Sequence, residues 1–156
     1  MICADAESFA AALPRAGALL GLDLGTKTVG VAVSDTRRRV ATPLETLRRT
    51  KFTADAQHLL AIARGRDAQG VVLGLPVNMD GTEGPRAQSA RSFAREFARL
   101  TDLPIAFWDE RLSTVAAERA LLEADASRRR RAEVIDAVAA GFILQGMLDR
   151  LGWLDG

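Results

Sequence analysis

The sequence predicts a single α/β domain in which a mixed five-stranded sheet carries helices on both faces. Short apolar runs bounded by Gly, Pro or Thr alternate with longer segments of helical periodicity, which is typical of strands connected by helices. The chain has 156 residues, of which 48% are hydrophobic, so it can form one domain with a substantial core. We expect residues 18–156 to form this domain and residues 1–17 to be an N-terminal appendage.

Three strands are expected at the start of the domain. Residues 18–24 and 28–34 are apolar runs, and the Gly- and Thr-containing segment between them predicts a hairpin. A third strand over residues 42–47 follows, so the first three strands form a meander.

The rest of the chain alternates between helices and strands. We expect its strand–helix–strand segments to pair in parallel through right-handed crossovers. The expected elements are a helix over 52–65, a strand over 70–75, a helix over 85–100, a strand over 104–108, a helix capped by Ser113 or Thr114 that runs to about Ala124, and a helix over 132–151. This order of elements is that of the ribonuclease H-like architecture.

Asp23 is a lone carboxylate inside the first apolar run. A carboxylate in a buried strand loses its hydration and must be neutralised, hydrogen-bonded or bound to a cation. The strand itself contains no cation, so the partner must come from another element or from solution. We therefore expect a metal or phosphate site at Asp23. The alternative is a carboxylate that bonds the backbone of the turn at residues 25–26.

Three further acidic residues occupy positions where burial is expected. Asp109 and Glu110 directly follow the strand over 104–108, and ligand sites in α/β sheets favour the carboxyl ends of strands. Asp136 is expected near the first turn of the last helix, on a largely apolar side of that helix. The alternative interpretation of Asp136 is an acid stabilised by the helix dipole.

Carboxylates from three separate elements suit hard cations that prefer oxygen ligands, such as Mg²⁺ or Mn²⁺. Two such ions can activate a water molecule and stabilise the leaving oxygen of a phosphodiester. Zinc chemistry and a Ser-His-Asp or Cys-His arrangement have little support, because His58 is the only histidine and Cys3 the only cysteine. The expected catalytic and metal-binding residues are Asp23, Asp109, Glu110 and Asp136.

Basic residues near these acids could contact phosphates. A run of four arginines at residues 128–131 precedes the Asp136 helix, whereas the stripe of arginines at 91, 95 and 99 is interpreted as a solvated face. The loop over 76–84 either faces the substrate or is an ordinary cluster of turn-forming residues. The expected substrate-binding residues are Lys27, Arg111, Arg128, Arg129, Arg130 and Arg131.

The composition limits the partners and the location of the protein. A net charge of +1 makes no case for nucleic acid over the whole surface, so any such contact must be local. A single cysteine excludes a disulfide within the chain. Asp5 and Glu7 stand where a signal peptide needs basic residues, and no apolar stretch is long enough to cross a membrane. We expect a cytoplasmic protein that binds no membrane.

Several segments, in order along the chain, resemble the YqgF family, whose members are described as candidate pre-16S ribosomal RNA nucleases and as homologues of Holliday junction resolvases. The resemblance covers about residues 18–150, and several motifs in order are more specific than any one of them. The segments are GLDLGTK (21–27), GVAVSD (30–35), GLPVNMDGTEG (74–84), DERLST (109–114) and VIDAVAA (134–140).

This resemblance implies a ribonuclease H-like fold and a metal-dependent nuclease that matures the 5′ end of small-subunit ribosomal RNA in the cytoplasm, on the pre-ribosomal particle. It implies Asp23 as the first acid, Asp109 or Glu110 as the second and Asp136 as the third. The family often has Ser after its last acid, but this chain has Ala137, so that position offers no hydroxyl.

Other functions remain open at this point. Residues 23–26 also resemble the phosphate loop of actin-like ATPases, but the chain has no room for the second domain that closes over ATP. A non-catalytic ribosome-assembly factor would use its acids structurally, although the scarcity of aromatic residues argues against broad single-strand binding by stacking. A further possibility is cleavage of four-way DNA junctions. Junction-cleaving enzymes normally act as symmetric dimers, so a concentration-dependent dimer would favour this function. The sequence therefore allows RNA or structured DNA as substrate, and a monomer or a homodimer.

Overall fold

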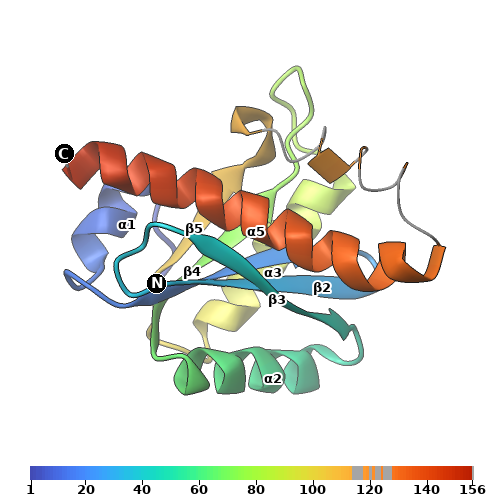
Figure 1. The fold of residues 1–156 in the computed structure, drawn as a ribbon, viewed down its shortest axis with the longest axis horizontal. Coiled ribbons are helices and arrows are strands. Elements are labelled where there is room, and N and C mark those ends of the chain that lie inside the picture. Colours follow the sequence, from blue (N-terminus) through green and yellow to red (C-terminus); the bar gives the residue numbers. More distant parts are fainter. Residues whose placement is uncertain (114–117, 120, 122–123, 125–127, 156) are drawn as a thin grey trace.

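The computed structural model of the protein describes residues 1–113, 118–119, 121, 124 and 128–155. A five-stranded sheet in the order β3-β2-β1-β4-β5 forms its centre (Figure 1). The first three strands are antiparallel, and β1-β4-β5 are parallel, so the sheet is mixed as predicted. The strands are β1 (Ala18–Leu24), β2 (Thr28–Ser34), β3 (Ala41–Arg48), β4 (Ala68–Leu75) and β5 (Ile105–Asp109).

Helices cover both faces of the sheet, which confirms the predicted fold class. Figure 1 shows α5 running across one face, with α1 beside its C-terminal part and α2 on the opposite side of the sheet. The predicted helix that begins at Ser113 or Thr114 falls largely outside the described residues. The helices are α1 (Ala6–Ala12), α2 (Phe52–Gly65), α3 (Pro85–Ala98), the short 3₁₀ helix η1 (Glu110–Leu112) and α5 (Arg128–Asp155).

The alternation of side chains along the strands divides the core into two layers. Leu20 and Val71 belong to the layer that packs against α2 and α3. Leu19 and Val72, each the neighbour of one of these residues, belong to the layer under α1 and α5. Both layers are fully apolar at these positions, which explains why the central strands appear in the sequence as continuous apolar runs.

Small residues let α5 lie unusually close to the sheet. A Cβ atom on Gly30 of β2 would lie 1.9 Å from the backbone oxygen of Asp136, and one on Gly21 of β1 would lie 2.7 Å from Cβ of Leu144. Any side chain at Gly30 would therefore push α5 away from the hairpin of β1 and β2. This contact fixes the position of Asp136 over the first residues of β2.

The last helix is longer than predicted, and this corrects the interpretation of Asp136. The helix already includes Arg128, so Asp136 lies about two turns inside it rather than at its start. Because the dipole acts mainly within the first turn, it does not account for an acid at this position.

None of the described helices is long and apolar enough to cross a membrane.

The N-terminal residues pack against the rest of the domain. The backbone N–H of Cys3 donates to the oxygen of Ile105 at 2.7 Å, and the N–H of Ile105 donates to the oxygen of Met1 at 2.8 Å. Phe9 of α1 is completely buried in the core layer under α5. The division of the chain at residue 17 stays a prediction, and deletion of residues 1–17 is the way to test it.

Candidate active site

Asp23 lies near the end of β1, the central strand, on the face that α5 covers. Its side chain is almost fully buried and accepts a hydrogen bond from Nη2 of Arg119 at 3.1 Å. Burial raises the pKa of Asp23, the positive charge of Arg119 opposes the rise, and the negative charge of Asp136 adds to it. The sequence left open whether the partner of Asp23 comes from another element or from solution, and in the structure Arg119 contacts it.

Glu110 is the second buried acid. It is the first residue of η1, immediately after β5, and its Oε2 would lie 3.1 Å from a Cβ atom on Gly74 of β4. Its Oε1 lies 3.7 Å from the same Nη2 of Arg119 that contacts Asp23. Burial raises the pKa of Glu110, and the nearby charge of Asp23 raises it further. One guanidinium therefore bridges two carboxylates that come from different elements, β1 and η1.

Asp109, the neighbour of Glu110, has a different environment. It forms an ion pair with Arg111, with a shortest distance of 2.7 Å between Oδ2 and Nη2, and it also accepts from the backbone N–H of Arg111. The hydrogen bonds from Arg111 lower the pKa of Asp109. The sequence left open which of the two acids lies beside Asp23, and in the structure it is Glu110.

Asp136 reaches the same region from α5. Its Oδ2 accepts a hydrogen bond from Oγ1 of Thr28, the first residue of β2, at 2.5 Å. Its backbone lies against Gly30, which pairs with Asp23 across β1 and β2. We call Asp23, Glu110 and Asp136 together the acid site.

Arg119 was not identified from the sequence. The need for a cation near Asp23 could be recognised, but Arg119 is 96 residues away in the chain and belongs to no motif. Its side chain is about one-fifth exposed, and its Nε is buried without a hydrogen-bond partner within the described part of the chain. Arg119 is thus the main source of positive charge inside the acid site.

The predicted substrate-binding residues are in three situations. Lys27 is exposed in the turn between β1 and β2, close in sequence to Asp23. Arg111 is engaged by Asp109. The backbone of the run at 128–131 forms the first turn of α5, and the positions of its side chains are outside the described part of the structure.

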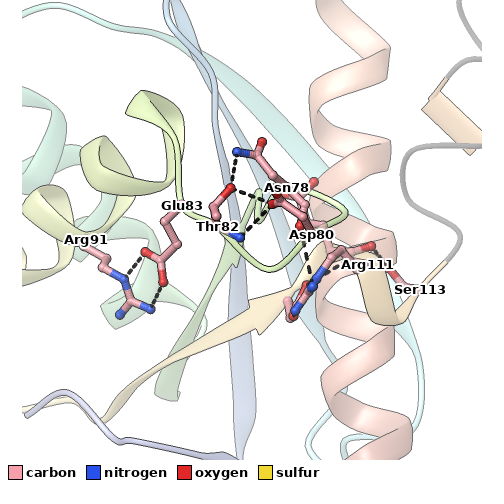
Figure 2. Close-up of polar contacts among 9 residues, drawn as sticks. Asn78, Asp80, Thr82, Glu83, Arg91, Arg111 and Ser113 are labelled. Atoms are coloured by element: carbon pink, nitrogen blue, oxygen red, sulfur yellow. Dashed lines mark hydrogen bonds and ion pairs between the residues drawn. The ribbon is translucent and has the colours of Figure 1, made fainter.

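The loop over residues 76–84 stands beside η1 and is braced by its own side chains (Figure 2). Asp80 accepts from the backbone N–H and the Oγ1 of Thr82, at 3.0 and 2.6 Å, and Asn78 donates to the same hydroxyl. Glu83 forms a two-point ion pair with Arg91 of α3, at 2.5 and 2.7 Å. Arg91, which the sequence assigned to a solvated face, therefore ties the loop to α3.

The donor set of the acid site suits a hard divalent cation. Among the described residues, no group of three or more His, Cys, Asp or Glu side chains is close enough to hold an ion as the side chains stand. The three acids nevertheless offer only oxygen ligands, and burial raises the pKa of Asp23 and Glu110 even with Arg119 present. The negative charge of these buried acids is only partly compensated, and a divalent cation would supply further positive charge.

A mixed five-stranded sheet with one acid near the end of β1, one directly after β5 and one on the last helix defines the class of ribonuclease H-like nucleases. The family described as RuvX, Holliday junction resolvase, matches residues 17–150, and the chain belongs to this RuvX/YqgF family. The predicted resemblance is thereby confirmed.

Relatives agree with this assignment, and a solved structure supports the fold. A protein of Paracoccus denitrificans is 73% identical over 99% of this chain and 98% of its own length, and one of Cereibacter sphaeroides is 70% identical over 99% and 96%. The names of both propose a nuclease activity on pre-16S rRNA. RuvC of Thermus thermophilus in complex with a Holliday junction substrate is similar in fold, with a TM-score of 0.55 and 13% identity over 87% of this chain and 96% of RuvC.

Proposed function

We propose that this protein is a metal-dependent nuclease that hydrolyses phosphodiester bonds of RNA and processes the 5′ end of pre-16S rRNA. The observation that carries the proposal is the buried pair of Asp23 and Glu110 at the carboxyl edge of the sheet. Burial raises the pKa values of both acids. Its substrate is taken from the names of close relatives. Action on ribosomal RNA, on the pre-ribosomal particle, would take place in the cytoplasm.

Each residue of the acid site has a proposed role. Asp23, Glu110 and Asp136 would hold Mg²⁺ or Mn²⁺, and Thr28 would orient Asp136 through its short hydrogen bond. The bound cation would supply positive charge for the scissile phosphate and a lowered pKa for the attacking water. Arg119 contacts both buried carboxylates and partly compensates their negative charge.

Basic residues around the acid site would position the substrate. Lys27 is exposed on the turn after β1, and the arginines at 128–131 begin α5, the helix that carries Asp136. Phosphate contacts from such residues fix the register of a nucleic acid without reading its sequence. Asp109, which Arg111 neutralises, is assigned no catalytic role.

A second candidate function is the resolution of four-way DNA junctions. The description of the family, Holliday junction resolvase, favours this function. Carboxylate-bound metal ions cleave DNA and RNA by the same chemistry, so the acid site is compatible with either substrate. A junction has two-fold symmetry, so its symmetric cleavage would require a homodimer. A monomer in solution would favour the RNA substrate.

The test compares the wild-type protein with Asp23→Asn on a 5′-extended rRNA precursor fragment in Mn²⁺ or Mg²⁺, with a four-way DNA junction as competitor. We expect Asp23→Asn to reduce RNA cleavage by at least roughly a hundredfold. Asp102→Asn, which changes an exposed acid after α3, is the matched control and should retain activity. Because burial raises the pKa of Asp23, replacing it with a neutral amide should leave the fold at least as stable. Undiminished cleavage by a well-folded Asp23→Asn would refute the mechanism.

A further inference from the structure

A pocket next to the acid site is lined by arginines and apolar side chains in addition to one of the acids. It lies between the loop over 76–84, the start of α3 and η1, and has a volume of about 360 Å³. Glu110 of the acid site is part of its wall, so any ligand in the pocket touches the edge of the acid site. This volume is at the lower end of the range for small-molecule sites. The pocket can therefore hold one small unit of a larger substrate, but not a duplex.

Three arginines line the pocket, and two of them are already occupied. Arg111 is paired with Asp109, and Arg119 is paired with Asp23 and Glu110. Arg86, in the first turn of α3, is exposed, and no other described residue forms a hydrogen bond or an ion pair with its side chain. Its guanidinium is therefore available to an anionic ligand.

Arg86 is close enough to the acid site to act on it. Its positive charge opposes the rise in the pKa of both Asp23 and Glu110. The start of α3 adds the partial positive charge of a helix N-terminus to the same wall, and no acidic residue in the first turn cancels it. Positive charge thus gathers immediately beside the acids.

Part of the pocket wall is apolar. This apolar wall is formed by Pro76, Met79 and Pro85, and the side chain of Met79 is almost fully exposed. The hydrogen bonds of Asp80 and Asn78 to Thr82 hold the loop in shape, as Figure 2 shows, so this wall exists before a ligand arrives. An apolar wall and a guanidinium in the same pocket match a nucleotide, which joins a base with flat apolar faces to a phosphate that can accept two hydrogen bonds from one arginine.

We propose that this pocket binds one unpaired nucleotide of the RNA beside the cleaved bond, with Arg86 holding its phosphate and the apolar wall contacting its sugar and base. The proposal rests on the proposed function, because it extends the same substrate past the acid site. It adds Arg86 to the substrate-binding residues and makes single-stranded RNA, rather than a duplex, the form that is recognised.

Binding of a short fluorescent single-stranded RNA tests the proposal, with Asp23→Asn as the background so that the probe is not cut. Adding Arg86→Gln should weaken binding about tenfold, because a charge-assisted phosphate contact is lost. It should also reduce the slope of log Kd against log salt by about one, whereas Arg86→Lys should retain the slope. Arg64→Gln, at the far end of α2, removes the same charge away from the pocket and is the control. Equal effects of Arg86→Gln and Arg64→Gln would overturn the proposal.

Competition separates a nucleotide pocket from a simple anion site. We expect a nucleoside 5′-monophosphate to displace the RNA at lower concentration than inorganic phosphate, because only the nucleotide contacts the apolar wall. Equal competition by the two would refute the nucleotide assignment. The outcome is independent of catalysis: RNA cleavage that persists in Asp23→Asn would refute the proposed function, whereas wild-type cleavage with no effect of Arg86→Gln on binding would refute the pocket alone.

Discussion

Two groups of carboxylates lie side by side in this protein and have opposite electrostatics. In the acid site, burial raises the pKa values of Asp23 and Glu110. In the adjoining loop and strand end, the pKa values of Asp80, Glu83 and Asp109 are all lowered. We call these three the rim acids. Their shifts come from hydrogen bonds to Thr82, Arg91 and Arg111, respectively, which favour the charged form.

The difference separates acids that stabilise the fold from the acids that we propose to be functional. Each rim acid has its partner within the structure, so its charge stabilises the loop. The acid site keeps buried negative charge that Arg119 and Arg86 only partly compensate, which should lower the stability of the free protein. Such uncompensated charge is typical of sites that bind a cation or perform chemistry.

Replacing each of the two neighbouring acids, Asp109 and Glu110, by its amide gives the largest expected difference in RNA cleavage. Glu110→Gln should reduce RNA cleavage by roughly a hundredfold, because it removes a buried charge from the acid site. Asp109→Asn should cleave almost like the wild type and instead lose about 1 kcal/mol of stability, since its pair with Arg111 is partly exposed. Cleavage assays and urea unfolding of both variants separate the two effects. Loss of activity in Asp109→Asn with normal activity in Glu110→Gln would reverse the assignment.

The hydrogen bond between Thr28 and Asp136 offers a smaller effect inside the acid site. Thr28→Val keeps the shape of the side chain but removes the donor, so Asp136 should be less well oriented. We expect cleavage to fall about tenfold, and the Mn²⁺ concentration that gives half-maximal rate to rise. Thr28→Ser is the control, because it retains the hydroxyl. A Val variant as active as the Ser variant would show that the bond does not position Asp136 for catalysis.

Among the rim acids, loss of the Glu83–Arg91 pair should affect mainly stability. Both side chains are partly exposed, so Glu83→Gln should lower the unfolding temperature only slightly. RNA cleavage should fall only slightly, through a looser loop over 76–84. Thermal unfolding together with cleavage rates tests this. A loss of activity as large as that of Glu110→Gln would place Glu83 among the functional acids instead.

The two groups should also differ in the pH dependence of stability, which is the smallest effect. The native pKa of Glu110 is raised, so its contribution to stability declines as pH rises from the ordinary glutamate pKa towards the native value. The native pKa of Asp109 is lowered, so its contribution grows as pH rises up to the ordinary aspartate pKa. Urea unfolding in chelator from about pH 3 to about pH 7 should show these opposite trends when each variant is subtracted from the wild type. Trends of the same sign would contradict the comparison.

Most of the fold could be predicted because the central strands β1, β2 and β4 are buried on both faces. The helix over 52–65 was predicted with the bounds that the structure gives it. β4 begins at Ala68, two residues earlier than predicted. The prediction missed these residues because the polar Gln69 interrupts the apolar run. The last helix was predicted to begin too late, since the arginines at 128–131 hide its helical periodicity.

The candidate site could be predicted only in part. Asp23 was recognisable because one charge in an apolar strand needs a partner. The choice between Asp109 and Glu110 was not, because the chain leaves β5 and turns into η1 between these two residues, and strand alternation no longer applies. Arg119 and Arg86 belong to no motif, and only the folded chain brings them to the acids.

Calorimetric titration of Mn²⁺ into the wild type, Asp109→Asn and Glu110→Gln tests the central claim most directly, because it measures the ion site without a substrate. The account predicts that Asp109→Asn binds Mn²⁺ like the wild type, whereas Glu110→Gln binds it at least about tenfold more weakly. Normal Mn²⁺ binding by a folded Glu110→Gln, with binding lost in Asp109→Asn, would contradict the separation of the acid site from the rim acids.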